Sequence, residues 1–111
     1  MMNKLNLFVN EQPAFEYDSS TELDDRQLAF LDKMDQEMER GFKIYGEMIV
    51  EPDVKQKATF VTMNLLRALQ QEDNIRIAVS CAYLATRLPH VVEVHARDQD
   101  DRIAIEFVEE H

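Results

Sequence analysis

Residues 91–108, VVEVHARDQDDRIAIEFV, alternate apolar and polar side chains in the manner of a β-hairpin. The central DQDD sequence is rich in residues that favour turns. A two-residue loop there sets Val94 opposite Ile105, but it also sets like charges against one another. A slip by two residues keeps the same apolar face inward and pairs His95 with Glu106. The sequence leaves these two registers open.

A two-stranded hairpin is marginal alone and needs helices behind it and a further strand. Residues 4–9, KLNLFV, place Leu5, Leu7 and Val9 on alternate positions and predict a strand that can complete the sheet. The alternative is edge-to-edge pairing with the same hairpin of a second subunit. Residues 10–20 are predicted to form a loop, because Pro13 excludes a helix interior there.

The segment before the hairpin, residues 74–88, predicts a helix that is buried around most of its circumference. Residues 77–85 are apolar nearly all round, which is typical of a core helix. Acidic and capping residues at 72–74 favour its start, and Pro89 ends it.

The only cysteine, Cys81, lies on this helix among apolar neighbours. We therefore predict a buried thiol that packs as a small hydrophobic group. His90 is expected in the connection to the hairpin, and His95 on the polar face of the hairpin. This placement separates both histidines from the thiol and argues against a catalytic Cys/His pair.

Residues 51–73, EPDVKQKATFVTMNLLRALQQED, predict a second helix, with Pro52 in its first turn. Its core stripe comprises Val54, Ala58, Val61, Leu65, Ala68 and Leu69. Phe60 and Met63 lie on the opposite side of this helix, at about 100° per residue. A second apolar patch of this kind is either covered by the same chain or offered to a partner.

Residues 21–49 predict a long first helix, capped by Ser19 or Thr21. Apolar side chains recur there at spacings of three and four: Leu28, Leu31, Met34, Met38, Phe42, Tyr45 and Ile49. An unbroken helix would be about 43 Å long, whereas a compact chain of this length is about 34 Å across. The helix therefore either breaks at Gly41 or Gly46, or projects and is covered by a second molecule.

The acidic residues outnumber the basic ones by 22 to 12, which gives a formal charge of -10. This charge repels phosphate backbones and anionic lipids, so we expect neither a nucleic-acid nor a membrane partner. A lone cysteine makes no internal disulfide, and no apolar stretch has the length of a membrane span. We therefore expect a cytoplasmic protein.

Recognised catalytic and cofactor motifs are missing from the sequence. It has no glycine-rich phosphate loop, paired-cysteine metal motif, nucleophile elbow or HExxH. This favours a non-catalytic protein without a cofactor or a metal. The weak alternative is a metal or small-ligand site formed by Glu93, His95 and Glu106 on the exposed hairpin face. Asp35 is unusual because it lies in the apolar arc of the first helix, where it must reach solvent, pair with a cation such as Arg76 or Arg87, or have a raised pKa.

These segments predict one α+β domain, 1–111, in which three helices, the first one long, pack on a small antiparallel sheet. We divide it into an N-terminal strand and loop (1–20), a helical part (21–88), the hairpin (91–108) and a tail (109–111).

Apolar side chains in excess of what this core needs predict an interaction surface, which comprises Phe30, Ile44, Met48, Phe60 and Met63. We therefore expect a non-catalytic protein-interaction module that forms homodimers. One alternative is an acidic decoy that occupies a basic nucleic-acid-binding groove. The other is a small-ligand or metal-binding protein that uses the hairpin face around His95.

Overall fold

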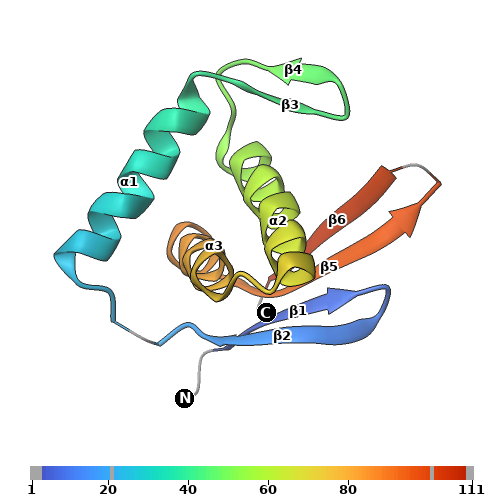
Figure 1. The fold of residues 1–111 in the computed structure, drawn as a ribbon, viewed down its shortest axis with the longest axis horizontal. Helices are drawn as coiled ribbons and strands as arrows, with labels where there is room; N and C mark the ends of the chain where they lie inside the picture. Colours follow the sequence, from blue (N-terminus) through green and yellow to red (C-terminus); the bar gives the residue numbers. More distant parts are fainter. Residues whose placement is uncertain (1–3, 21, 101, 110–111) are drawn as a thin grey trace.

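The computed structural model describes residues 4–20, 22–100 and 102–109. Within these ranges the chain forms three helices and six strands, and Figure 1 shows the helices gathered on one side of the larger sheet. The prediction of an α+β fold that ends in a β-hairpin is confirmed. The elements in chain order are β1 (Lys4–Val9), β2 (Gln12–Asp18), α1 (Asp25–Glu39), β3 (Phe42–Ile44), β4 (Glu47–Ile49), α2 (Val54–Gln71), α3 (Asn74–Arg87), β5 (Val91–Gln99) and β6 (Arg102–Glu109).

The larger sheet, called the main sheet below, has the strand order β2-β1-β5-β6. Its outer pairs are antiparallel, whereas β1 and β5 at its centre run parallel, with Leu7 beside Val94. The sheet is therefore mixed rather than purely antiparallel. The prediction that KLNLFV supplies the additional strand is confirmed.

The predicted loop at residues 10–20 is wrong, because most of it forms β2. Phe15 and Tyr17 point to the same face of the main sheet as Leu7 and Leu5, their partners on β1. Pro13 is tolerated because β2 is an edge strand and the register shifts next to it. A proline that excludes a helix is thus compatible with a strand at this position.

The register of the C-terminal hairpin is the slipped one of the two that the sequence allows. His95 lies opposite Glu106 and Val94 opposite Phe107. This arrangement avoids the like-charge pairs of the other register and keeps the apolar face inward. A bulge between Val91 and Glu93 lets Val91 and Val94 both face the helices, and both are buried.

The core lies between this face of the main sheet and helices α2 and α3. Leu5 and Leu7 from β1 and Val94 from β5 meet buried side chains of the two helices, which include Val61, Leu65, Ile77, Cys81 and Leu84. The helix α2 begins with a capping box between Asp53 and Gln56, so Pro52 precedes the cap instead of lying in the first turn as predicted. Asp73 caps α3, and α3 ends before Pro89, as predicted.

The prediction of one long helix over residues 21–49 is wrong, and the alternative of a break at the glycines is confirmed. The helix α1 starts after Asp24, which forms a capping box with Gln27, so Ser19 is not its cap. The predicted cap Thr21 lies outside the described residues. The helix ends at Glu39, and β3 and β4 then form a small hairpin with Phe42 opposite Ile49.

Gly41 explains why the helix stops where it does. Its φ of +97° is unfavourable for residues with a β-carbon, and a β-carbon at this position would lie 2.9 Å from the carbonyl oxygen of Ile49. The residues from Phe42 to Ile49 keep the spacing of the helical stripe but pack as a hairpin. The resulting molecule measures 38 × 32 × 31 Å.

The β3–β4 hairpin is tied to the main sheet by Tyr45 in its turn. The Tyr45 hydroxyl donates to the carbonyl oxygen of Ile103 at 2.5 Å and accepts from the Ile103 N–H at 2.6 Å. The guanidinium of Arg102 lies 5.3 Å from the centre of the Tyr45 ring. One side chain therefore occupies both backbone groups of a residue on the edge strand β6.

Asp35 anchors α1 to the other two helices. Its carboxylate accepts a hydrogen bond from the Tyr83 hydroxyl and another, at 2.8 Å, from Arg87 Nε, both on α3. Lys57 Nζ of α2 lies 3.7 Å from the same carboxylate. The predicted pairing with Arg87 is confirmed, whereas Arg76 pairs with Asp73, the cap of its own helix. An acid inside an apolar arc is thus explained by a three-helix polar junction.

We expect Gly41→Ala to destabilise the fold by about 2–4 kcal/mol, because it combines an unfavourable φ with a clash against the Ile49 carbonyl. Gly46→Ala is the matched control, since Gly46 also has a positive φ but no atom lies near its added β-carbon. It should cost only about 1–2 kcal/mol. Urea unfolding measures both, and equal losses would contradict the close approach at Gly41.

We expect Asp35→Asn to lower the free energy of unfolding by about 1–3 kcal/mol, because it weakens the charge-assisted bonds that hold α1. Asp32→Asn removes a more exposed partner of the same Arg87, with 67% of the side chain exposed against 23% for Asp35. That control should cost less than about 1 kcal/mol. Thermal and urea unfolding should show this difference, and similar losses in the two variants would argue against a special role of Asp35.

Candidate functional site

Cys81 is a core residue, as predicted from the sequence. Its side chain is buried on α3 within the core cluster. Burial raises the pKa of the Cys81 thiol to about 12, so the thiol is protonated near neutral pH. His90 is exposed in the connection after α3, and His95 lies on β5 between the inward-facing Val94 and Ala96. Neither of these two histidines, which are the ones that the structure describes, therefore lies in the environment of the thiol that a catalytic pair would need.

His95 lies on the face of the main sheet away from the helices. Its Nε2 lies 2.8 Å from Glu93 Oε1, and its ring stacks on Phe8 with centroids 4.6 Å apart. Glu106 lies opposite His95 in the strand register. The three predicted residues are thus neighbours on one face. Among the residues that the structure describes, however, no three His, Cys, Asp or Glu side chains are grouped as a metal site requires.

The polar junction around Asp35 is the other place where titratable groups gather. Burial and the neighbouring Asp35 raise the pKa of the Tyr83 hydroxyl well above its ordinary value. A phenol of this kind keeps its proton near neutral pH and acts as a hydrogen-bond donor to the carboxylate. The arrangement holds helices together and is poorly suited to general acid–base chemistry.

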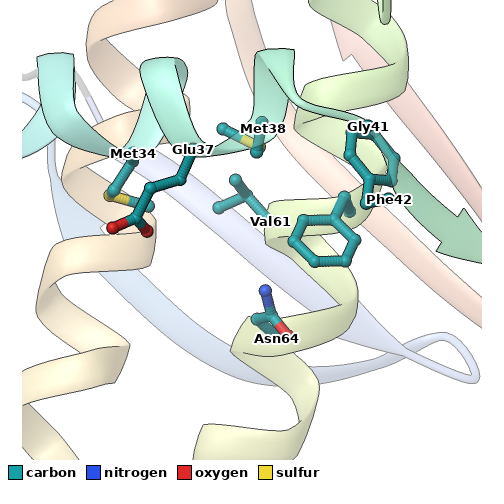
Figure 2. A pocket seen from close by; sticks show the side chains of 8 residues that line it. Met34, Glu37, Met38, Gly41, Phe42, Val61 and Asn64 are labelled. Carbon is teal, nitrogen blue, oxygen red and sulfur yellow. The ribbon is translucent and has the colours of Figure 1, made fainter. Parts of the chain in front are cut away.

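A concave apolar surface lies between the three helices, and we call it the helical groove. It consists of two adjoining hollows that share Met34, Val61 and Asn64. The first hollow, of about 280 Å³, lies between α1, β3 and α2 and is also lined by Met38, Phe42 and Phe60. The second, of about 360 Å³, reaches α3 and is also lined by Phe30, Ile75 and Val79. Figure 2 shows Met34 and Met38 on the α1 side of the first hollow and Val61 and Asn64 on its α2 side.

The rim of the helical groove carries apolar side chains that face solvent. Phe30 is 50% exposed and Ile75 is 79% exposed, which is high for large apolar residues. Among the described residues, Glu37 and Arg76 are the charged side chains that line the groove. The groove is therefore apolar and close to neutral, although the chain as a whole has a formal charge of -10.

The predicted interaction residues lie in different places. Phe30 and Phe60 line opposite ends of the helical groove, and Phe60 stacks on Phe42 with ring centroids 4.4 Å apart. Ile44 on β3 packs partly against the core, and Met63 on α2 is half-buried. Met48 on β4 is 55% exposed and lies beside Gly41, outside the lining of the groove.

Sequence reasoning missed Ile75 and Val79 on the α3 side of the groove. Both were included in a helix predicted to be buried around most of its circumference. Their spacing of four residues places them on one face, beyond the arc that a single neighbouring helix can cover. The width of the apolar arc on this helix was the sequence feature that could have identified the two residues.

None of the described helices is both long and apolar enough to pass through a lipid bilayer.

We expect the stability contributed by the Cys81 thiol to be present below pH 9 and to fall as the pH rises toward 12. The thiol pKa is raised in the folded state, so the unfolded chain loses this proton first. The stability difference between the natural protein and Cys81→Ala should therefore change by up to about 1.4 kcal/mol per pH unit in this window. Urea titrations at several pH values measure it. If the stability difference between the two proteins stays constant from pH 8 to 11, folding does not raise the pKa of the Cys81 thiol.

Comparisons with models of known protein families, with curated proteins and with solved structures find no match to this chain.

Proposed function

We propose that the protein is a non-catalytic interaction module that self-associates through the helical groove. The observation that carries the proposal is the pair of exposed apolar side chains, Phe30 and Ile75, on the rim of an apolar hollow. Contiguous apolar surface of this kind is typical of protein–protein interaction sites. The lone buried thiol and the acidic surface are compatible with a cytoplasmic protein.

The basis for self-association differs from the one that the sequence suggested. An unbroken first helix would have needed a second molecule to cover it, but α1 ends at Glu39. The groove supplies a different reason, because the same surface contains both a hollow and protruding side chains. A two-fold symmetric dimer requires such a self-complementary patch.

The nearly neutral lining of the groove permits a second copy of the chain as the occupant. Two molecules that each carry a formal charge of -10 repel one another, and this repulsion is smallest when they meet through a patch that is close to neutral. Glu37 and Arg76 lie in adjoining hollows of the groove. A two-fold arrangement can set Glu37 of one copy toward Arg76 of the other, which complements the apolar contacts.

We expect the natural protein to sediment as a dimer at micromolar concentration and Ile75→Asp to shift it to a monomer. The substitution places a charge in the apolar interface, and it should leave the fold intact because Ile75 is largely exposed. Sedimentation velocity at several concentrations, with circular dichroism to check folding, measures the effect.

Val50→Asp is the matched control for the oligomer experiment. Val50 is 71% exposed but lies between β4 and α2, outside the lining of the helical groove. This variant should remain dimeric. A natural protein that stays monomeric at all concentrations, or an equal effect of both variants, would overturn the proposal.

A further inference from the structure

The strand β6 forms one edge of the main sheet, and the direction of its backbone groups follows from two sets of hydrogen bonds. Ile103 directs both its N–H and its carbonyl away from β5, toward Tyr45. Its partner on β5, Asp98, donates its N–H to the Asn10 side chain on the other side. Asp98 and Ile103 are therefore a non-hydrogen-bonded pair of the antiparallel β5–β6 ladder.

The same direction recurs at every second residue along β6. Ile105 and Phe107 must point their N–H and carbonyl groups outward, as Ile103 does. An independent contact agrees, because the carbonyl of Ala96, opposite Ile105, accepts a hydrogen bond from the Asn10 N–H on the β1 side. Tyr45 forms hydrogen bonds with the backbone N–H and carbonyl of Ile103. No described residue forms a hydrogen bond with the outward-pointing backbone groups of Ile105 or Phe107.

A hollow of about 290 Å³ runs beside this part of the edge. Its apolar lining comes from Leu88, Val91, Ile105 and Phe107. Acidic and basic groups also line it, namely Glu106, Glu109 and Lys55. Outward-pointing backbone groups next to a hollow for alternate side chains are the elements that strand addition requires.

The opposite edge of the main sheet lacks this combination. There β2 carries Pro13, which has no N–H to donate, and the register of its pairing with β1 is irregular beside it. Proline and bulges are the usual means by which proteins protect sheet edges. The β6 edge is protected by Tyr45 at Ile103 only, within the part of the chain that the structure describes.

We propose that the Ile105–Phe107 edge of β6 binds an extended, basic segment of a partner protein as an additional antiparallel strand. Alternate apolar side chains of that segment would enter the hollow on the helix side. The side chains between them would lie on the open face of the sheet beside Glu106, which is exposed. A basic residue opposite Glu106 forms an opposite-charge cross-strand pair, and the negative charge of the whole chain attracts a basic segment.

A second copy of this chain is a poor occupant of the same edge. In a two-fold β6–β6 pairing centred on residue 106, Glu106 would lie opposite Glu106 of the partner subunit, which is unfavourable. Centring the pairing on Phe107 instead sets Glu109 opposite Ile105 on the apolar side of the strand. Centring it on Ile105 requires the backbone groups of Ile103, which Tyr45 already occupies. The site also lies outside the lining of the helical groove, so it is independent of the proposed dimer.

The probe for this site is an end-blocked heptapeptide of alternating lysine and valine, titrated into the ¹⁵N-labelled protein. We expect saturable shifts of the Ile105 and Phe107 amide signals. In an antiparallel addition the valine side chains share a face with Ile105, so the valine N–H groups point at β6. Methylating the valine backbone nitrogens should weaken binding about tenfold or more, whereas methylating the lysine backbone nitrogens should leave it nearly unchanged.

Charge reversal provides a matched pair of protein variants. Glu106→Lys should weaken binding of the peptide more than Glu22→Lys, which makes the same change in net charge at an exposed position before α1. The proposal is overturned if neither residue's signals shift, if the two methylated peptides bind equally, or if the two variants behave alike. Shifts confined to Phe30, Ile75 and their neighbours would assign the peptide to the helical groove instead.

Discussion

Gly41 has a backbone conformation that side-chain-bearing residues avoid, and its α-carbon faces the carbonyl of Ile49 too closely for a β-carbon. This constraint ends α1 and turns the following apolar residues into the β3–β4 hairpin. The reversal has two effects on the rest of the molecule. It lets α1 lie beside α2 and α3 with the helical groove between them, and it carries Tyr45 to the edge of the main sheet. Both surfaces to which we assign binding therefore depend on it.

The attachment of α1 to the other two helices is partly polar. Leu31 and Met38 are its buried side chains within the described residues, and Asp35 lies between them in sequence, bound to Tyr83 and Arg87. A helix held by few apolar contacts leaves apolar surface uncovered on its neighbours. The helical groove is the result, since Ile75 and the partly buried Val79 would be covered by a helix that packed more closely.

The parts of the fold that were predictable from sequence are those where local pattern and burial agree. The alternation in the C-terminal hairpin, the apolar surroundings of Cys81 and the need of Asp35 for a cation all led to correct expectations. Prediction failed where one pattern fits two structures. Phe42 and Ile49 continue a helical stripe and also pair in a short hairpin, and only the φ of Gly41 decides between them. Similarly, Pro13 excludes a helix but not an edge strand. The helical groove was only partly predictable. The sequence identified Phe30 as an apolar side chain in excess of what the core needs, whereas the exposure of Ile75 depends on where α1 lies.

The Tyr45 hydroxyl has a consequence for the solubility of the protein. Without it, three successive outward-facing residues of β6 would present one uninterrupted ladder, and long bare ladders of this kind recruit identical chains into growing fibres. By engaging both backbone groups of Ile103, the phenol shortens that template. The small β3–β4 hairpin thus reduces the length of β6 that is open to pairing with another strand.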